Sequence, residues 1–290
     1  MNKRRRLGLI VVLGVAITAA AFFALRPREP VCQGKRLSVW LRELDNASLT
    51  VDSHNQAVEA VRQIGAKGLP TLDRMLRASD PWLKRKIIEL SRKQSLIRFH
   101  LTTEEEQRRL ALRGIETLGP LAEPLVPMLI EMLSGDTYTM ATAMRALARI
   151  GPAVMAPLAQ ALTNTSPHIR GAAIETFLLM GSNAHSGIPA ILQHLDDPDS
   201  RVRASAAMAL GVIGKEPTHV VPALTSHLSD SEYDVRAAVA EALGRFGSSA
   251  LPALPALMRL QDDTSQFVRA TAASAMKQIK SEAAARAECQ

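Results

Sequence analysis

Four arginines, each directly after a valine or isoleucine, recur at a constant interval in the second half of this 290-residue chain. A sequence that repeats itself every 20 to 50 residues or so folds as an array of similar units, each packed mainly against its neighbours. The regular 33-residue step therefore argues against a single closed globular core and predicts an elongated array. The four residues are Arg170, Arg203, Arg236 and Arg269.

Each unit is predicted to be a pair of helices, which we call helix A and helix B. Helix A is expected to end at a glycine, because glycine adopts the left-handed conformation that terminates helices with little strain. A proline eight positions later is expected to open helix B, since the first turn of a helix needs no N–H there. Apolar residues recur at helical spacing in both halves of the unit. The glycines are Gly119, Gly151, Gly181, Gly214 and Gly247, and the prolines are Pro127, Pro189, Pro222 and Pro255, with Pro157 slightly early.

An acidic residue stands six positions before three of the four arginines, and asparagine takes its place in the first copy. An acid in the link between repeats can pair with an arginine early in a helix, across the turn and across adjacent repeats. We interpret the two rows as a structural ladder that keeps the repeats in register. The alternative is a track of arginines that binds an acidic ligand. The residues are Asp197, Asp230, Asp263 and Asn164.

Residues 197–214 and 230–247 carry the pattern Asp, Val-Arg, Ala-Leu-Gly and Ile/Phe-Gly, followed by a proline-led helix. This pattern resembles the short HEAT repeats of the family also called PBS-lyase HEAT-like, and the resemblance covers about residues 106–280. It implies an all-α, right-handed α-solenoid of helical hairpins. The family spans scaffolds, lyases and regulators, so the resemblance is strong for the fold and weak for the function.

Residues 1–26 differ from the repeats. Four basic residues at 3–6 precede an uncharged run at 7–25, whose helical length of about 28 Å is close to the hydrocarbon thickness of a bilayer. The basic cluster predicts a cytoplasmic N-terminus, with the repeats in the periplasm or another extracytoplasmic space. We expect residues 1–26 to form one uncleaved transmembrane helix. The alternative is a signal peptide cleaved after the alanines at 19–21, which would make the protein secreted.

The net charge of +7 comes largely from this N-terminal segment. Without five of its basic residues the chain holds 30 basic and 28 acidic residues, and aromatic residues make up only 3%. A nucleic-acid-binding surface is typically strongly basic. We therefore expect no nucleic-acid partner.

Between the anchor and the regular repeats the pattern is irregular. Residues 27–52 are expected to form a linker and a capping helix, on which Leu37, Trp40, Leu41 and Leu44 share one face. Residues 53–105 are expected to hold a first repeat and a basic helical insertion, because the interval from Gly65 to Gly119 is much longer than the regular step. The regular repeats then span 106–280, and 281–290 are expected to form a C-terminal tail. The basic residues of the insertion either form a solvated helix face or dock an acidic partner or anionic lipid, through Lys84, Arg85 and Arg92.

No catalytic, phosphate-binding or metal-binding motif is present in the sequence. His194 and His227 occupy equivalent positions in successive repeats, which are too far apart to converge on one metal ion. Cys32 and Cys289 lie at opposite ends of the predicted array, so no intramolecular disulfide is expected. We expect no cofactor, no metal and no small-molecule substrate.

These features predict a membrane-tethered HEAT-like scaffold that binds another protein, whose identity the sequence does not reveal. The expected binding surface is the concave face, lined by helix B. Two alternatives remain: a lyase-like or other modifying enzyme built on the same repeats, and a self-assembling structural array. The outward row on helix B is predicted at Gln160, Gln193, Ser226 and Arg259.

Overall fold

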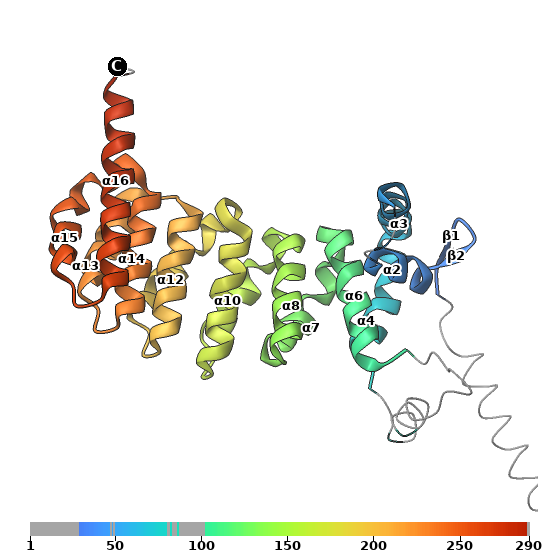
Figure 1. The fold of residues 1–290 in the computed structure, drawn as a ribbon. Helices are drawn as coiled ribbons and strands as arrows, with labels where there is room; N and C mark the ends of the chain where they lie inside the picture. The colour runs from blue at the N-terminus through green and yellow to red at the C-terminus, as the bar shows by residue number, and fades with distance from the viewer. Residues whose placement is uncertain are drawn as a thin grey trace, which may run out of the picture.

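The computed structural model describes residues 29–46, 48, 50–79, 82, 86 and 102–288. These residues form an elongated, helical array in which one helix of each repeat stands beside the corresponding helix of the next repeat (Figure 1). The only strands in this part of the chain are β1 (Val31–Cys32) and β2 (Lys35–Arg36), which pair antiparallel. The all-α solenoid predicted from the regular period is confirmed, while its handedness stays a prediction.

The array is built from helix A–helix B hairpins. The N-terminal part contains α2 (Leu37–Asp45), α3 (Val51–Ile64) and α4 (Leu69–Leu76). The helices A that follow are α6 (Glu104–Leu118), α8 (Thr137–Ile150), α10 (Pro167–Met180), α12 (Ser200–Ile213), α14 (Tyr233–Arg245) and α16 (Gln266–Glu288). The helices B between them are α7 (Val126–Glu131), α9 (Met155–Ala161), α11 (Ile188–Leu192), α13 (Pro217–Ser226) and α15 (Leu254–Arg259).

The five glycines lie at the end of helix A, as predicted. Gly214 has the expected left-handed conformation, with φ 62° and ψ 27°, whereas Gly119, Gly151 and Gly181 combine a positive φ with ψ between −126° and −141°. All five have positive φ, between 53° and 87°, a conformation that other residues adopt only with strain. Short 3-10 turns then lead into helix B, as in η2 (Gly119–Leu125) and η8 (Gly247–Ala253). One repeat departs from the prediction: α13 begins at Pro217, ahead of the expected Pro222, which therefore lies inside the helix. Glu216, with φ 53°, makes the reversal there and leaves room for a longer helix B.

Neighbouring helices A pack closely because small residues face one another. A Cβ atom added at Gly211 in α12 would lie 2.7 Å from the Cα of Ala242 in α14. A Cβ atom at Gly244 in α14 would lie 3.1 Å from the Cα of Ala275 in α16. Both distances are shorter than ordinary van der Waals contact, so a larger side chain at either glycine would force the helices apart.

The N-terminal helix α2, the expected cap, packs on the first hairpins through one apolar face. The four residues of that face, Leu37, Trp40, Leu41 and Leu44, are buried, and Trp40 is fully enclosed. The indole Nε1–H of Trp40 donates a hydrogen bond to the Cys32 carbonyl, 3.0 Å away, while the Lys35 ammonium lies 4.2 Å from the ring centroid. A Cβ atom at Gly114 in α6 would lie 2.7 Å from Leu41 Cδ2, so α2 also packs directly on α6. The cap therefore covers apolar surface of the first hairpins.

Two predictions fall on residues that the structure does not describe. The proposed transmembrane run at 7–25 lies outside the described residues, as do Lys84, Arg85 and Arg92 of the basic insertion. Among the described helices, none is long and apolar enough to cross a bilayer. At the other end, residues 281–288, expected as a tail, continue α16 as helix above the rest of the stack (Figure 1).

Candidate functional site

The predicted ladder residues meet between adjacent repeats, along the edge where the helices A begin. Each arginine comes from helix A of one repeat, and its aspartate lies in the link before helix A of the next. The Nε of Arg203 lies 2.8 Å from Asp230 Oδ2, and its Nη2 lies 2.8 Å from Asp230 Oδ1. Their side chains are only 14% and 8% exposed. The same two-pronged geometry, with distances of 2.6–2.9 Å, joins Arg170 to Asp197 and Arg236 to Asp263.

The third guanidinium nitrogen, Nη1, bonds to backbone carbonyl oxygens of the link that precedes the arginine's own helix. The Nη1 of Arg203 donates to the carbonyl oxygens of Asp197 and Pro198, at 2.9 and 3.4 Å. Arg170, Arg203 and Arg236 therefore each bond the backbone of one link and the carboxylate of the next. The spacing in the sequence indicated that an arginine could pair across the turn and across adjacent repeats, but not that it bonds a backbone in one link and a carboxylate in the other. Two-pronged, charge-assisted pairs of this kind are among the stronger hydrogen bonds in proteins.

The rung carboxylates are stabilised in their charged form. Burial acts to raise the pKa of Asp197 and Asp230, but hydrogen bonds from arginine and from the backbone outweigh it and hold both pKa values below the ordinary range. At Asp263 the hydrogen bonds from Arg236 are the largest influence and lower the pKa. Each carboxylate also accepts the backbone N–H two residues further on, at 2.8–2.9 Å. The three rungs are therefore ionised at neutral pH.

The first copy of the ladder lacks both members of the ion pair, the arginine and the aspartate. The fourth residue of α8 is Met140, where the later helices A carry arginine. The link after that repeat has Asn164 in place of aspartate, and the Asn164 side chain caps the backbone N–H of Ser166 at 2.9 Å. Where no arginine is present, the link thus keeps its turn but carries no negative charge.

A second network of ion pairs joins the N-terminal helices, and no sequence pattern predicted it. Arg109 of α6 lies 3.0 Å from Asp45 of α2, and Arg145 of α8 lies 3.2 Å from Glu116 of α6. Arg113 stands between them, 3.2 Å from Glu116. These helices do not follow the regular period closely, so no constant spacing marks the pairs in the sequence. The arginines are 39–47% exposed, so each pair contributes little to stability.

The predicted helix B row is exposed along its whole length: Gln160, Gln193, Ser226 and Arg259 all lie on the surface, at or just beyond the end of a helix B. Each follows a buried apolar residue by two positions. Alignment on these buried residues adds Glu131, which follows Leu129 and is also exposed. The regular step missed Glu131 because the glycine intervals that lead up to Gly181 are shorter than those that follow it.

The two equivalent histidines link successive helices B. His194 places its Nδ1 2.9 Å from the Ala190 carbonyl oxygen and its Nε2 3.0 Å from the Leu162 carbonyl oxygen of the preceding repeat. His227 repeats the local contact, and its Nε2 lies 3.1 Å from Asp196 Oδ1. Both nitrogens of each ring thus lie within hydrogen-bond distance of an oxygen atom of the chain.

The described residues contain no group of three or more His, Cys, Asp or Glu side chains placed to hold a metal ion. Cys32 is a free thiol whose Sγ lies 3.3 Å from Gln63 Oε1, while Cys289 lies outside the described residues. Trp82 and Lys86, at the start of the basic insertion, are exposed.

Comparison with known proteins identifies the repeats. A family model described as HEAT repeats matches residues 122–211 and again 188–277, together more than half of the chain. No curated protein matches the sequence. Among solved structures, Kap121p is similar with a TM-score of 0.55 and 18% identity over 85% of this chain, which spans 29% of that protein.

Two further solved structures resemble the array more weakly. The complex of CpcE and CpcF of phycocyanin lyase from Nostoc sp. PCC7120 has a TM-score of 0.49 and 20% identity over 53% of this chain and 98% of that chain. Human deoxyhypusine hydroxylase has a TM-score of 0.37 and 18% identity over 84% of this chain and 96% of that chain. At these identities the likeness concerns the fold alone.

Proposed function

Because this chain belongs to the HEAT-repeat family, we propose that it is a scaffold that binds another protein along the helix B side of its solenoid. HEAT-repeat solenoids are generally protein-binding scaffolds, since a row of similar helices offers one long, continuous surface. The proposed binding face is concave and belongs to a right-handed array. The row at Gln160, Gln193, Ser226 and Arg259 is its proposed centre.

One contrast between the two polar surfaces supports this choice. The guanidinium groups of Arg170, Arg203 and Arg236 are filled by the chain's own carboxylates and carbonyls. On helix B, by contrast, no hydrogen bond or ion pair within the described part of the chain engages the side chains of Gln160 and Gln193. Each of these arginines thus uses four of its five N–H donors within the chain, whereas the helix B row presents amide groups that a partner can bind. Amide groups of this kind can form some of the direct hydrogen bonds, about ten in number, that a typical protein interface carries.

We further propose that residues 7–25 hold the scaffold at a membrane, with the repeats on the extracytoplasmic side. The support is the uncharged run and the basic cluster that precedes it. Cleavage after the alanines at 19–21 would instead release the repeats. In the anchored form, the basic residues Lys84, Arg85 and Arg92 are candidates for contact with anionic lipid headgroups, which attract positive charge.

The binding proposal is tested with two matched sets of alanine substitutions in the full-length chain. The first set changes the helix B row Gln160, Gln193, Ser226 and Arg259. The control set changes four exposed helix A residues at the same regular spacing, namely Glu175, Met208, Glu241 and Ser274. Partners are captured by chemical crosslinking in membranes, and melting of each variant is followed by circular dichroism.

We expect the helix B set to lose most of the captured partner while helicity and melting stay unchanged, and the helix A set to capture as the parent chain does. Undiminished capture by the helix B set, or loss confined to the helix A set, would overturn the proposal. We assign no catalytic role, and copurification of a coloured or metal cofactor would contradict that assignment. Concentration-dependent light scattering would instead favour the self-assembling array.

A further inference from the structure

The last arginine of the ladder holds the same position as the others but has no carboxylate. Arg269 donates from Nη1 to the carbonyl oxygens of Asp263 and Thr264, at 2.6 and 3.2 Å. Arg236 makes the same two contacts one repeat earlier, to Asp230 and Ser231. Because a guanidinium is planar and rigid, the two shared contacts direct the Nε–Nη2 edge of Arg269 outward, as in Arg236. Within the described part of the chain, no carboxylate occupies that edge.

The three filled rungs show which ligand this edge accepts. In each, two carboxylate oxygens meet Nε and Nη2 at 2.6–2.9 Å. In each, the aspartate also accepts the backbone N–H two residues later, directly before a helix. The ligand of every rung is therefore an aspartate that a turn presents at the start of a helix.

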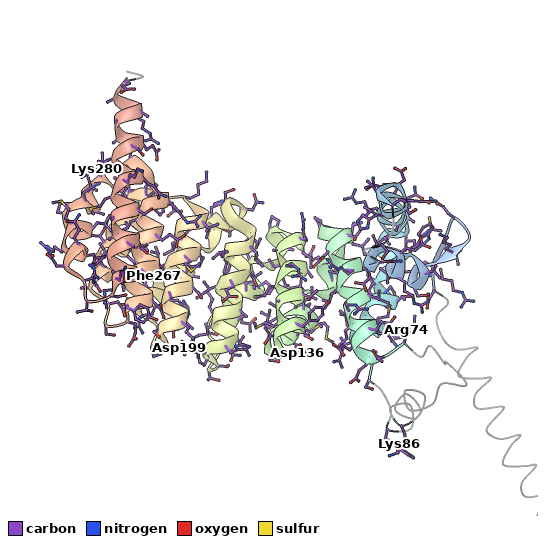
Figure 2. The ribbon with its side chains drawn as sticks, viewed as in Figure 1. Arg74, Lys86, Asp136, Asp199, Phe267 and Lys280 are labelled. Atoms are coloured by element: carbon purple, nitrogen blue, oxygen red, sulfur yellow. The ribbon has the colours of Figure 1, made fainter. Side chains whose placement is uncertain are left out.

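The surface around Arg269 does not suit a further repeat that packs as closely as the preceding ones do. The twelfth residue of α12 is Gly211 and that of α14 is Gly244, and both admit the next helix at short distance. The twelfth residue of α16 is Lys277, which is exposed. Lys280 also stands where Gly214 and Gly247 end the preceding helices, so α16 continues without the turn that leads to helix B (Figure 2). A neighbour can therefore contact the first turns of α16 but cannot lie close along its whole length.

We propose that Arg269 is a docking site for an aspartate of a partner protein, presented on a turn at the start of a helix. The guanidinium is already oriented by two backbone carbonyls, so little side-chain entropy is lost when the carboxylate binds. Arginine is enriched in protein interfaces. This site is separate from the helix B row.

The test uses the ladder's own ligand as a probe. A synthetic peptide with the sequence of residues 230–245 carries the aspartate turn and the start of a helix, and a second peptide carries Asp230→Asn. Each is titrated into full-length chain labelled with 15N-arginine, and the Nε–H signal of Arg269 is followed by NMR. We expect this signal to move with the aspartate peptide, and the asparagine peptide to bind at least tenfold more weakly.

Two variants of the full-length chain separate the site from other causes. Arg269→Lys keeps the positive charge but not the two-pronged geometry, and we expect at least a tenfold loss of affinity for the aspartate peptide with unchanged circular dichroism. Arg201→Gln, at an 82% exposed arginine of α12 that belongs to neither proposed site, is expected to bind the peptide as the parent does. Equal affinity for both peptides, an Arg269 signal that stays unmoved at millimolar peptide, or full binding to Arg269→Lys would each overturn the proposal. None of these results bears on capture through helix B.

Discussion

The substitution Asp230→Asn isolates one rung of the ladder. The asparagine keeps the size of the side chain and an oxygen for the Glu232 N–H, which Asp230 Oδ1 accepts at 2.9 Å. It removes the charge that Arg203 meets with two bonds of 2.8 Å. Breaking a fully buried ion pair costs about 3–5 kcal/mol. Because this pair is 8–14% exposed and Arg203 keeps its bonds to the Asp197 link, we expect a loss of about 2–3 kcal/mol.

Hydrogen exchange measures this loss where it occurs. Repeat proteins open in parts, so a single global unfolding energy does not describe them well. A loss of about 2–3 kcal/mol corresponds to roughly 30- to 150-fold faster exchange of amides protected by the contact between α12 and α14. The measurement uses mass spectrometry on the full-length chain in mild detergent.

Glu241→Gln is the matched control because it also neutralises an acid paired with an arginine. Glu241 and Arg245 lie 2.9 Å apart on the surface of α14, and both are 48% exposed. Such a pair contributes about 0.3–0.5 kcal/mol, so exchange should change by less than about threefold. If Asp230→Asn accelerates exchange no more than Glu241→Gln does, the ladder is not what holds these repeats together.

Three further predictions test the packing and the charges. Folding lowers the pKa values of the three rung aspartates, so their contribution to stability is full above the unfolded pKa of about 3.9 and is lost as the pH falls below it. The urea midpoint should therefore drop between pH 5 and pH 3, and it should drop less steeply in a variant with all three aspartates changed to asparagine. Gly211→Ala should lower the free energy of unfolding by about 1–3 kcal/mol, because the new Cβ would lie 2.7–2.8 Å from atoms of Ala242. Gly171→Ala has open space around the new Cβ, so it should raise the free energy of unfolding by up to about 1 kcal/mol in the same denaturation assay. Trp40→Ala should cost about 3–5 kcal/mol and remove the blue-shifted fluorescence of a buried indole, while Trp82→Ala should leave stability within about 0.5 kcal/mol, and the reverse pattern would contradict the capping role of α2.

The regular half of the molecule was predictable because its period repeats local chemistry. Glycine tolerates the positive φ at the end of helix A without strain, and all five glycines have a positive φ there. The aspartates and arginines share a register, which pointed to pairs across adjacent repeats. The sequence did not indicate that Arg203 takes the backbone of Asp197 and the carboxylate of Asp230, because spacing alone does not say which atom of a residue an arginine meets.

Other features depend on local choices that a period does not record. Glu131 was not included in the predicted helix B row because the intervals between the helix-ending glycines before Gly181 are shorter than the regular step. Pro222 lies within α13 because Glu216 makes the turn before it, and a positive φ at a glutamate has no sequence signature. The pairs that join α2, α6 and α8 come from residues far apart in the sequence that belong to no repeating pattern. Only the packed structure brings these side chains together.

The most direct test of the proposed function is site-specific photocrosslinking in intact membranes. A photoreactive amino acid replaces Gln193 on the helix B row, or Glu241 on helix A as a control; both positions are exposed. We predict that illumination joins a partner protein to position 193 and that position 241 forms no such adduct. An adduct at position 241 with none at position 193 would contradict binding through helix B.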